Sequence, residues 1–168
     1  MELRKKGFSI IELIVVIAII GYLSSIVIGS IHSAKEKTTL ARAKQDLKSV
    51  AQALELYAID NGGYPADVSR ALPNGIEAYL PSNIWPLASW PGSVFDWENW
   101  TDPATGLPIY QISIRFCPIG GPLSACAFPP EPWATNFDIN SSVYYCVQGA
   151  CRAHISEVVS YPGYCINC

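Results

Sequence analysis

Glu12 has the most unusual chemistry in this chain, because it is the only Asp, Glu, Lys, Arg or His between Gly7 and Ile31. A lone carboxylate inside a membrane-spanning helix costs about 2.5–3.5 kcal/mol on insertion scales, and it usually has a function and a partner. If the chain is cut after Gly7, the new amine at Phe8 lies roughly 6 Å from Glu12 along a helix axis. Within one helix that amine points the wrong way, whereas a neighbouring copy shifted by this distance presents its amine to Glu12. The sequence therefore predicts self-assembly through a charge pair.

The cysteines form a second reactive group, and all six lie in the distal part of the chain: Cys117, Cys126, Cys146, Cys151, Cys165 and Cys168. An even number beyond a membrane helix is typical of disulfides formed in an oxidising compartment. We predict the neighbouring pairs Cys117–Cys126, Cys146–Cys151 and Cys165–Cys168. The second pair follows from a tight hairpin expected at Gln148-Gly149, which places its cysteines opposite each other. Ties from Cys165 and Cys168 back to Cys117 or Cys126 stay open.

The terminal pair Cys165-Ile-Asn-Cys168 has two other interpretations. A redox centre needs the motif at a helix N-terminus, and here no helix is expected to follow. A zinc site needs two more ligands, of which His154 is one candidate. A structural disulfide is the interpretation that we favour.

Asp96, Glu98 and Asp102 form an acidic cluster and are weak calcium candidates. The regular ligand spacing of a helix–loop–helix calcium site is absent, so a solvated loop is the expectation and no cofactor is predicted. The only histidines are His32 and His154. No nucleophile elbow or phosphate-binding glycine loop accompanies them, so we expect a protein that is not an enzyme.

The element that must position Glu12 is a long N-terminal helix. The run after the basic residues 4–6 is long enough to cross a bilayer, with the basic flank in the cytoplasm. A secretory signal peptide has a shorter apolar core, and a plain membrane anchor leaves Glu12 unexplained. Gly21 and Gly29 each weaken the helix by about 1 kcal/mol relative to alanine. From Ser33 to Asn61 apolar residues recur every three or four positions, which predicts an amphipathic continuation.

The junction Lys6-Gly7-Phe8-Ser9, followed by Glu12, resembles the leader junction of type IV prepilins and the related pseudopilins. The resemblance implies that a prepilin peptidase cuts between Gly7 and Phe8 and methylates the new Phe8 amine. It also implies that Glu12 neutralises a neighbouring subunit's N-terminus during assembly. In that family a proline usually stands at the position of Gly29, and the helix between it and the earlier glycine loosens in the filament. Softening at Gly21 and Gly29 is the corresponding expectation.

The helix ending LELYAIDNGGYP, residues 54–65, resembles the end of the long helix in major pseudopilins of type II secretion. Those proteins hold calcium near an Asp-Pro-Trp-Gly stretch, which this chain lacks. Together the two resemblances extend from about residue 5 to residue 65.

Proline, glycine and tryptophan dominate the next segment, and a long connecting loop is expected there. Residues 110–116 and 142–147 alternate as strands do. From Tyr64 onward three basic residues stand against eight acidic ones, so no specific nucleic-acid binding is expected.

The predicted fold is α+β and pilin-like, with the long helix packed on a small antiparallel sheet whose loops are stapled by disulfides. Five segments are expected: a cleaved leader at 1–7, a transmembrane and filament-core helix at 8–31, an amphipathic helix at 32–61, a connecting loop at 62–108 and a β-sheet region at 109–168.

The expected function is a structural subunit of a type IV pilus-like filament. A major-type pseudopilin of type II secretion is the alternative, and a non-polymerising, membrane-anchored binding domain is a second one. The expected partners are identical subunits in a helical homopolymer, the prepilin peptidase, and the assembly platform with its ATPase. The chain is expected to wait in the bacterial cytoplasmic membrane with its N-terminus inside and then to enter a surface filament.

Overall fold

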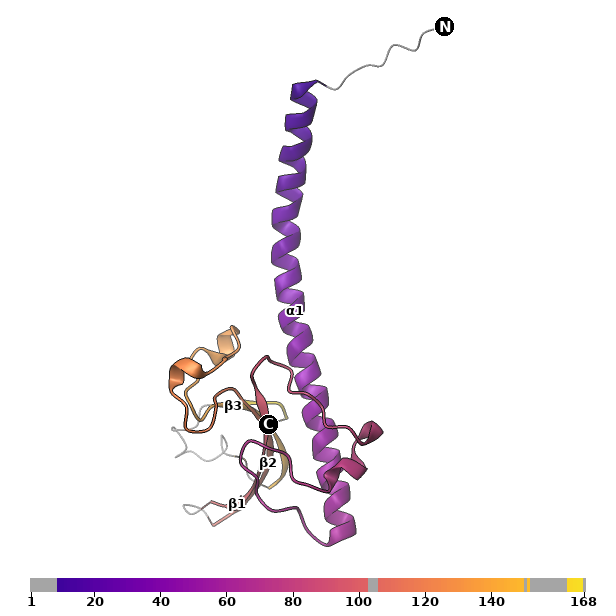
Figure 1. Ribbon diagram of the computed structural model, residues 1–168, viewed down its shortest axis with the longest axis vertical. Helices are drawn as coiled ribbons and strands as arrows, with labels where there is room; N and C mark the ends of the chain where they lie inside the picture. Colours follow the sequence, from indigo (N-terminus) through magenta and orange to yellow (C-terminus); the bar gives the residue numbers. More distant parts are fainter. Residues whose placement is uncertain (1–8, 103–105, 150, 152–162, 168) are drawn as a thin grey trace. The chain divides into compact units, whose positions relative to one another are not determined.

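The computed structural model describes residues 9–102, 106–149, 151 and 163–167. By its internal contacts the chain divides into two units, residues 1–38 and 39–168, and each is described by itself. Their elements are one long helix and a four-stranded sheet, which confirms the predicted α+β class (Figure 1).

The helix α1 extends over Ile10–Asn61, in agreement with the predicted helix to within two residues. In the first unit, its segment Ile10–Ile28 has a mean hydropathy of 2.6, and it is long and apolar enough to cross a membrane. Its large apolar side chains are exposed within the single chain. At the other end, the Asn61 Nδ2 group donates to the carbonyl oxygen of Tyr57 (2.9 Å). Gly62 follows with φ +74°, the left-handed conformation that commonly ends a helix.

In the second unit, α1 buries one face against the sheet. The buried positions recur at the spacing of one helix face: Ala43, Leu47, Val50, Ala51 and Leu54. They share one core with Phe95, Trp97, Ile112, Ile114 and Val143 of the strands. The sheet accordingly lies alongside the C-terminal part of α1 (Figure 1).

The sheet consists of β1 (Val94–Thr101), β2 (Pro108–Arg115), β3 (Ser142–Gly149) and β4 (Gly163–Cys165), in that spatial order. β1 pairs with β2 and β2 with β3 in antiparallel fashion, and these pairs match the prediction. β4 runs parallel to β3, so the sheet is mixed where an entirely antiparallel one was expected.

The expected boundary between loop and sheet at residue 108 is wrong, because β1 lies inside the segment that was assigned to the loop. Trp97 at the centre of β1 is fully buried, and its indole Nε1 donates to the carbonyl oxygen of Pro65 (3.0 Å). Four consecutive residues from Phe95 to Glu98 are buried. Residues 95–98 alternate between apolar and polar side chains, but the prolines and glycines around them are typical of a loop.

The predicted hairpin at Gln148-Gly149 is also wrong. Gln148 and Gly149 both belong to β3, and Gln148 pairs with Tyr110 of β2. The C-terminal tail is held against β3 by Asn167, whose side chain accepts from the Cys146 amide (2.8 Å) and donates to the Cys146 carbonyl (2.9 Å).

The outer edge of β1 is covered by residues 67–71. The Val68 amide donates to the carbonyl oxygen of Trp97, and the Trp97 amide donates to that of Ala71, both at 3.2 Å. The Asn99 amide donates to Oδ1 of Asp67 (2.9 Å). The backbone groups that an edge strand usually leaves open are therefore occupied here.

Candidate assembly site

Glu12 lies in the first turn of α1 and closes a reciprocal cap with Ser9. The Ser9 backbone amide donates to Oε2 of Glu12 (2.8 Å), and Oγ of Ser9 accepts from the Ile11 amide (3.2 Å). The Ser9 carbonyl accepts the first helical hydrogen bond, from the Leu13 amide (3.2 Å). This arrangement is a capping box, in which two otherwise unpaired donors at the helix start are satisfied.

The cap fixes the Glu12 carboxylate at the amide of Ser9, the second residue after the predicted cleavage point. Gly7 and Phe8 lie outside the described residues, so the cleavage and methylation sites remain predictions. The arrangement offers a carboxylate that can exchange a neutral amide donor for a cationic amine, and hydrogen bonds to charged donors are the stronger ones.

Sequence reasoning identified Glu12 and missed Ser9. The signal was present, because a serine followed three residues later by glutamate, directly before an apolar run, is the capping-box signature.

Gly21 and Gly29 both lie inside α1, which continues through them as a helix. A Cβ atom placed on Gly21 would meet no atom within 4 Å in the single chain. Packing within the chain therefore gives no reason for glycine at position 21. The softening that the family resemblance implies stays a prediction.

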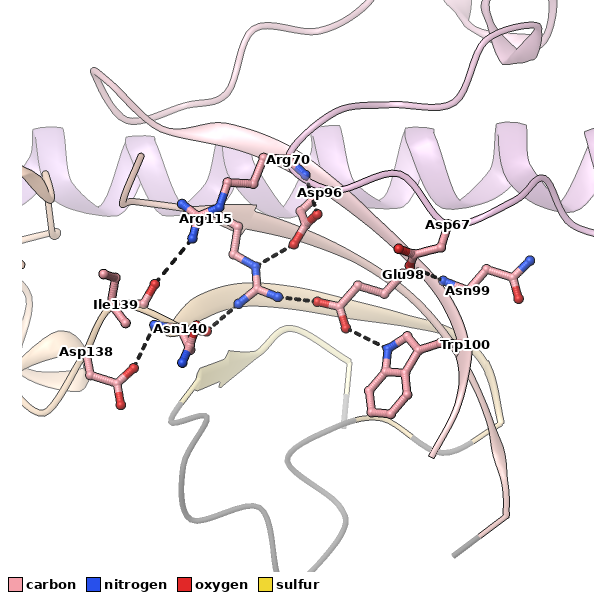
Figure 2. A network of polar contacts seen from close by, with 10 residues as sticks. All are labelled: Asp67, Arg70, Asp96, Glu98, Asn99, Trp100, Arg115, Asp138, Ile139 and Asn140. Atoms are coloured by element: carbon pink, nitrogen blue, oxygen red, sulfur yellow. Dashed lines mark hydrogen bonds and ion pairs between the residues drawn. The ribbon is translucent and has the colours of Figure 1, made fainter. Parts of the chain in front are cut away.

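Asp96 and Glu98 of the acidic cluster lie on β1, where they are buried and ion-paired, so the expected solvated loop is wrong. Asp96 and Glu98 alternate along the strand and lie on the sheet face opposite Trp97, and Arg115 of β2 lies between their carboxylates (Figure 2). The Arg115 Nε group contacts Oδ2 of Asp96 at 2.6 Å, and its two terminal nitrogens contact Glu98 and the Asn140 carbonyl. All three charged side chains are at most 7% exposed.

Arg70 joins the same network from the segment that covers β1. Its backbone amide donates to Oδ1 of Asp96 (2.6 Å), and its guanidinium reaches the Ile139 carbonyl (3.5 Å; Figure 2). Burial and the neighbouring Arg115 guanidinium lower the pKa of Arg70, and the Asp96 carboxylate opposes this shift. Arg70 thus supports Asp96 through its backbone amide, whereas Arg115 is the cation that contacts both carboxylates.

This network argues against calcium at Asp96 and Glu98, because Arg115 occupies the space between their carboxylates. Asp102 instead shapes the turn after β1, where its carbonyl accepts from the Gly106 amide (2.7 Å). In the described part of the chain, no group of three or more His, Cys, Asp or Glu side chains is arranged to hold a metal ion.

Among the described residues, the structure contains two of the three predicted disulfides: Cys117–Cys126 and Cys146–Cys151. Cys165 is also disulfide-bonded, and its predicted partner, Cys168, lies outside the described residues. A cysteine in a disulfide has no thiolate to offer, which disfavours the zinc interpretation for this state of the protein. His154 likewise lies outside the described residues.

Comparison with known proteins agrees with the N-terminal part of this picture. A family model described as the prokaryotic N-terminal methylation motif matches residues 3–31. The type II secretion system core protein G of Pectobacterium carotovorum subsp. carotovorum is 40% identical over 63 residues, 38% of this chain and 40% of the relative. The protein of the same name from Escherichia coli K12 is 36% identical over 75 residues, 45% of this chain and 51% of the relative.

A third relative of that name, from Vibrio cholerae serotype O1, is 34% identical over 88 residues, 51% of this chain and 57% of the relative. The chain thus spans about half the length of the relatives that it matches. No solved structure matches. The methylation motif and the similarity to these proteins support a member of the family of type IV pilins and type II secretion pseudopilins.

Proposed function

We propose that this chain is a major-type pseudopilin, a structural subunit of the filament of a type II secretion system. The observation that carries the proposal is the similarity to relatives named as core protein G of that system. These relatives favour the pseudopilin over the type IV pilus subunit that the sequence analysis placed first.

In this proposal, the segment Ile10–Ile28 anchors the chain in the cytoplasmic membrane with the leader inside. The prepilin peptidase removes residues 1–7 and methylates Phe8. The assembly platform and its ATPase then transfer the subunit into a helical homopolymer. The exposed apolar side chains of Ile10–Ile28 pack against identical helices after leaving the lipid.

Glu12 is the residue that couples membrane insertion to assembly. Before assembly its carboxylate accepts a hydrogen bond from the Ser9 amide, which lowers the free-energy cost of placing the carboxylate in the membrane. The methylated amine of the next copy is a positively charged donor and replaces that amide. The copies are related by a repeated shift along one direction, so the contact is heterologous and generates an open fibre.

The experiment compares Glu12→Gln with wild type in cells that carry the peptidase and a type II secretion assembly system. Edman sequencing should show that the wild-type chain begins at Phe8. Glu12→Gln should insert into the membrane and lose assembly, measured by sedimentation of sheared filaments. Glu36→Gln is the matched control, because it removes a carboxylate from the same helix beyond the membrane segment. A mature chain that begins at Met1, or normal assembly of Glu12→Gln, would refute the proposal.

A type IV pilus subunit remains the second candidate, favoured by the distal domain with its disulfides and buried aromatic core. Electron microscopy separates the two candidates. Long surface fibres made of wild-type protein at its native level support the pilus, and short fibres confined to the cell envelope support the pseudopilus.

A further inference from the structure

Two different disulfides of the second unit come close to each other where β3 lies beside β4. Cys146 of β3 is bonded to Cys151, and Cys165 of β4 is bonded within another disulfide, for which Cys168 is the predicted partner. The Sγ atoms of Cys146 and Cys165 are nevertheless only 4.0 Å apart. Thiol–disulfide exchange begins with a thiolate next to a disulfide sulfur, so this contact is a starting geometry for exchange.

Hydrogen bonds hold the backbone around both cysteines. The Asn167 side chain accepts from the Cys146 amide (2.8 Å) and donates to the Cys146 carbonyl (2.9 Å). The Ile166 amide donates to the carbonyl oxygen of Tyr144 (2.9 Å), and Tyr144 pairs with Cys165 in the parallel register of β3 and β4. These bonds do not depend on either disulfide, so they keep the two cysteines side by side when one disulfide opens. The remaining gap between the sulfur atoms can then close by rotation of the side chains, and a pair held in place in this way reacts as if at high concentration.

Exposure to solvent distinguishes the two sulfur atoms of the Cys146–Cys151 disulfide. Cys146 is half-buried, as is Cys165, whereas Cys151 is fully buried. The thiolate is the form of cysteine that attacks a disulfide, and burial away from water disfavours this charged form. After reduction of the bond, Cys146 is therefore the residue that supplies the thiolate, and a disulfide sulfur of Cys165 already lies beside it.

We propose that Cys146 and Cys165 form a thiol–disulfide exchange site, at which opening of either disulfide ends with these two residues bonded to each other. The co-reactant is a dithiol, which reduces Cys146–Cys151 to two thiols and is itself oxidised to a disulfide. The Cys146 thiolate then attacks Sγ of Cys165, so that the Cys146–Cys165 bond forms, the bond from Cys165 to Cys168 breaks, and the electron pair leaves on the Cys168 sulfur.

The reverse entry follows the same chemistry. When the Cys165 disulfide is opened first, the Cys165 thiolate attacks Sγ of Cys146 and Cys151 leaves as the thiolate. Both routes consume one dithiol, and the exchange step itself transfers no net electrons. The product ties β4 directly to β3, so the sheet keeps a covalent link at this edge after one disulfide has been reduced. This inference does not rest on the proposed function, because it concerns the single folded chain.

The direct test removes one sulfur atom and identifies the thiol that is left free. The full-length Cys151→Ser chain is purified in detergent without reductant, quenched in acid and alkylated with N-ethylmaleimide in denaturant. The labelled cysteine is then identified by mass spectrometry. The label is expected to shift from Cys146, the former partner of Cys151, to Cys168, together with a peptide in which Cys146 is bonded to Cys165. Label on Cys146 would overturn the inference.

The reciprocal variant and a matched control use the same measurement. Cys168→Ser should carry its label on Cys151, and label on Cys165 would contradict the exchange. Cys126→Ser opens the disulfide outside the exchange site, so its label should stay on Cys117. Transfer of that label to other cysteines would show general scrambling and would overturn the claim of a specific site.

The wild-type chain provides a readout that does not depend on the folding of a variant. The folded chain is treated with one equivalent of dithiothreitol at mildly alkaline pH and then quenched and labelled in the same way. Molecules that have lost one of the two neighbouring disulfides should carry label on Cys151 and Cys168 and retain a Cys146–Cys165 bond. Label on Cys146 together with Cys151, or on Cys165 together with Cys168, would show simple reduction without exchange and would overturn the inference.

Discussion

Replacement of Arg115 by methionine is the most demanding test of the buried network described above. The variant leaves the carboxylates of Asp96 and Glu98 inside the protein, at most 7% exposed, without their shared cation. Breaking a buried pair by removing one partner costs about 3–5 kcal/mol, because the remaining charge is uncompensated. For a unit of this size the melting temperature should fall by on the order of 10–20 °C.

The assay is thermal unfolding of the full chain in detergent with its disulfides intact, followed by near-ultraviolet circular dichroism of the buried tryptophans. Asp96→Asn and Glu98→Gln combined with Arg115→Met is the matched control. It removes all three charges together, and replacing a buried network by neutral groups costs far less than breaking it. The control should recover most of the lost stability.

A single variant that melts within about 2 °C of wild type at neutral pH would refute the assignment of Arg115 as the cation of a buried network, since that shift corresponds to well under 1 kcal/mol.

Three further predictions concern other positions. Ser9→Ala should cost about 0.5–2 kcal/mol at the helix start, measured as faster hydrogen exchange at the Ile11 amide, and unchanged exchange there would contradict the cap. Tyr144→Phe should be neutral or stabilise by up to about 1–3 kcal/mol in denaturant unfolding, because the Tyr144 hydroxyl is buried without a hydrogen-bond partner among the described residues. Burial raises the pKa of Tyr144. Its contribution to the free energy of unfolding is therefore complete below its pKa in the unfolded chain and is lost as the pH rises through its pKa in the folded protein. The phenylalanine variant should thus resist alkaline unfolding better than wild type. Hydrogen bonds lower the pKa of Glu77. Its contribution to the free energy of unfolding is therefore present above its pKa in the unfolded chain and is lost as the pH falls through its pKa in the folded protein. Glu77→Gln should remove this acid sensitivity, as followed by the fluorescence of Trp85, whose indole nitrogen donates to Glu77 (3.1 Å).

Local patterns predicted most of the fold. The apolar run and the amphipathic spacing that follows it gave α1 almost to its ends at Ile10 and Asn61. Alternation gave β2 and β3, because their polar and apolar residues point to different faces. β1 was missed although residues 95–98 alternate in the same way, because the prolines and glycines around it are typical of a loop. The parallel placement of β4 depends on contacts between distant residues, which no local pattern contains.

The residues of the candidate site were also only partly predictable from local sequence patterns. Glu12 was found because a carboxylate in an apolar run is a local anomaly, and Ser9 was missed although its signature is equally local. Arg115 was beyond prediction, because its partners on β1 and at Asn140 are brought to it only by the strand register and the following turn. Its role becomes visible only when the sheet is known.

The covered edge of β1 has a consequence for how this chain associates. Proteins held at high density in a membrane can pair through exposed strand edges, and such pairing leads to irreversible aggregation. Residues 67–71 already satisfy the amides of Trp97 and Asn99, so a foreign strand would first have to displace them. Under the proposed function, this cover keeps the β-domain from competing with the helix for contacts to neighbouring subunits.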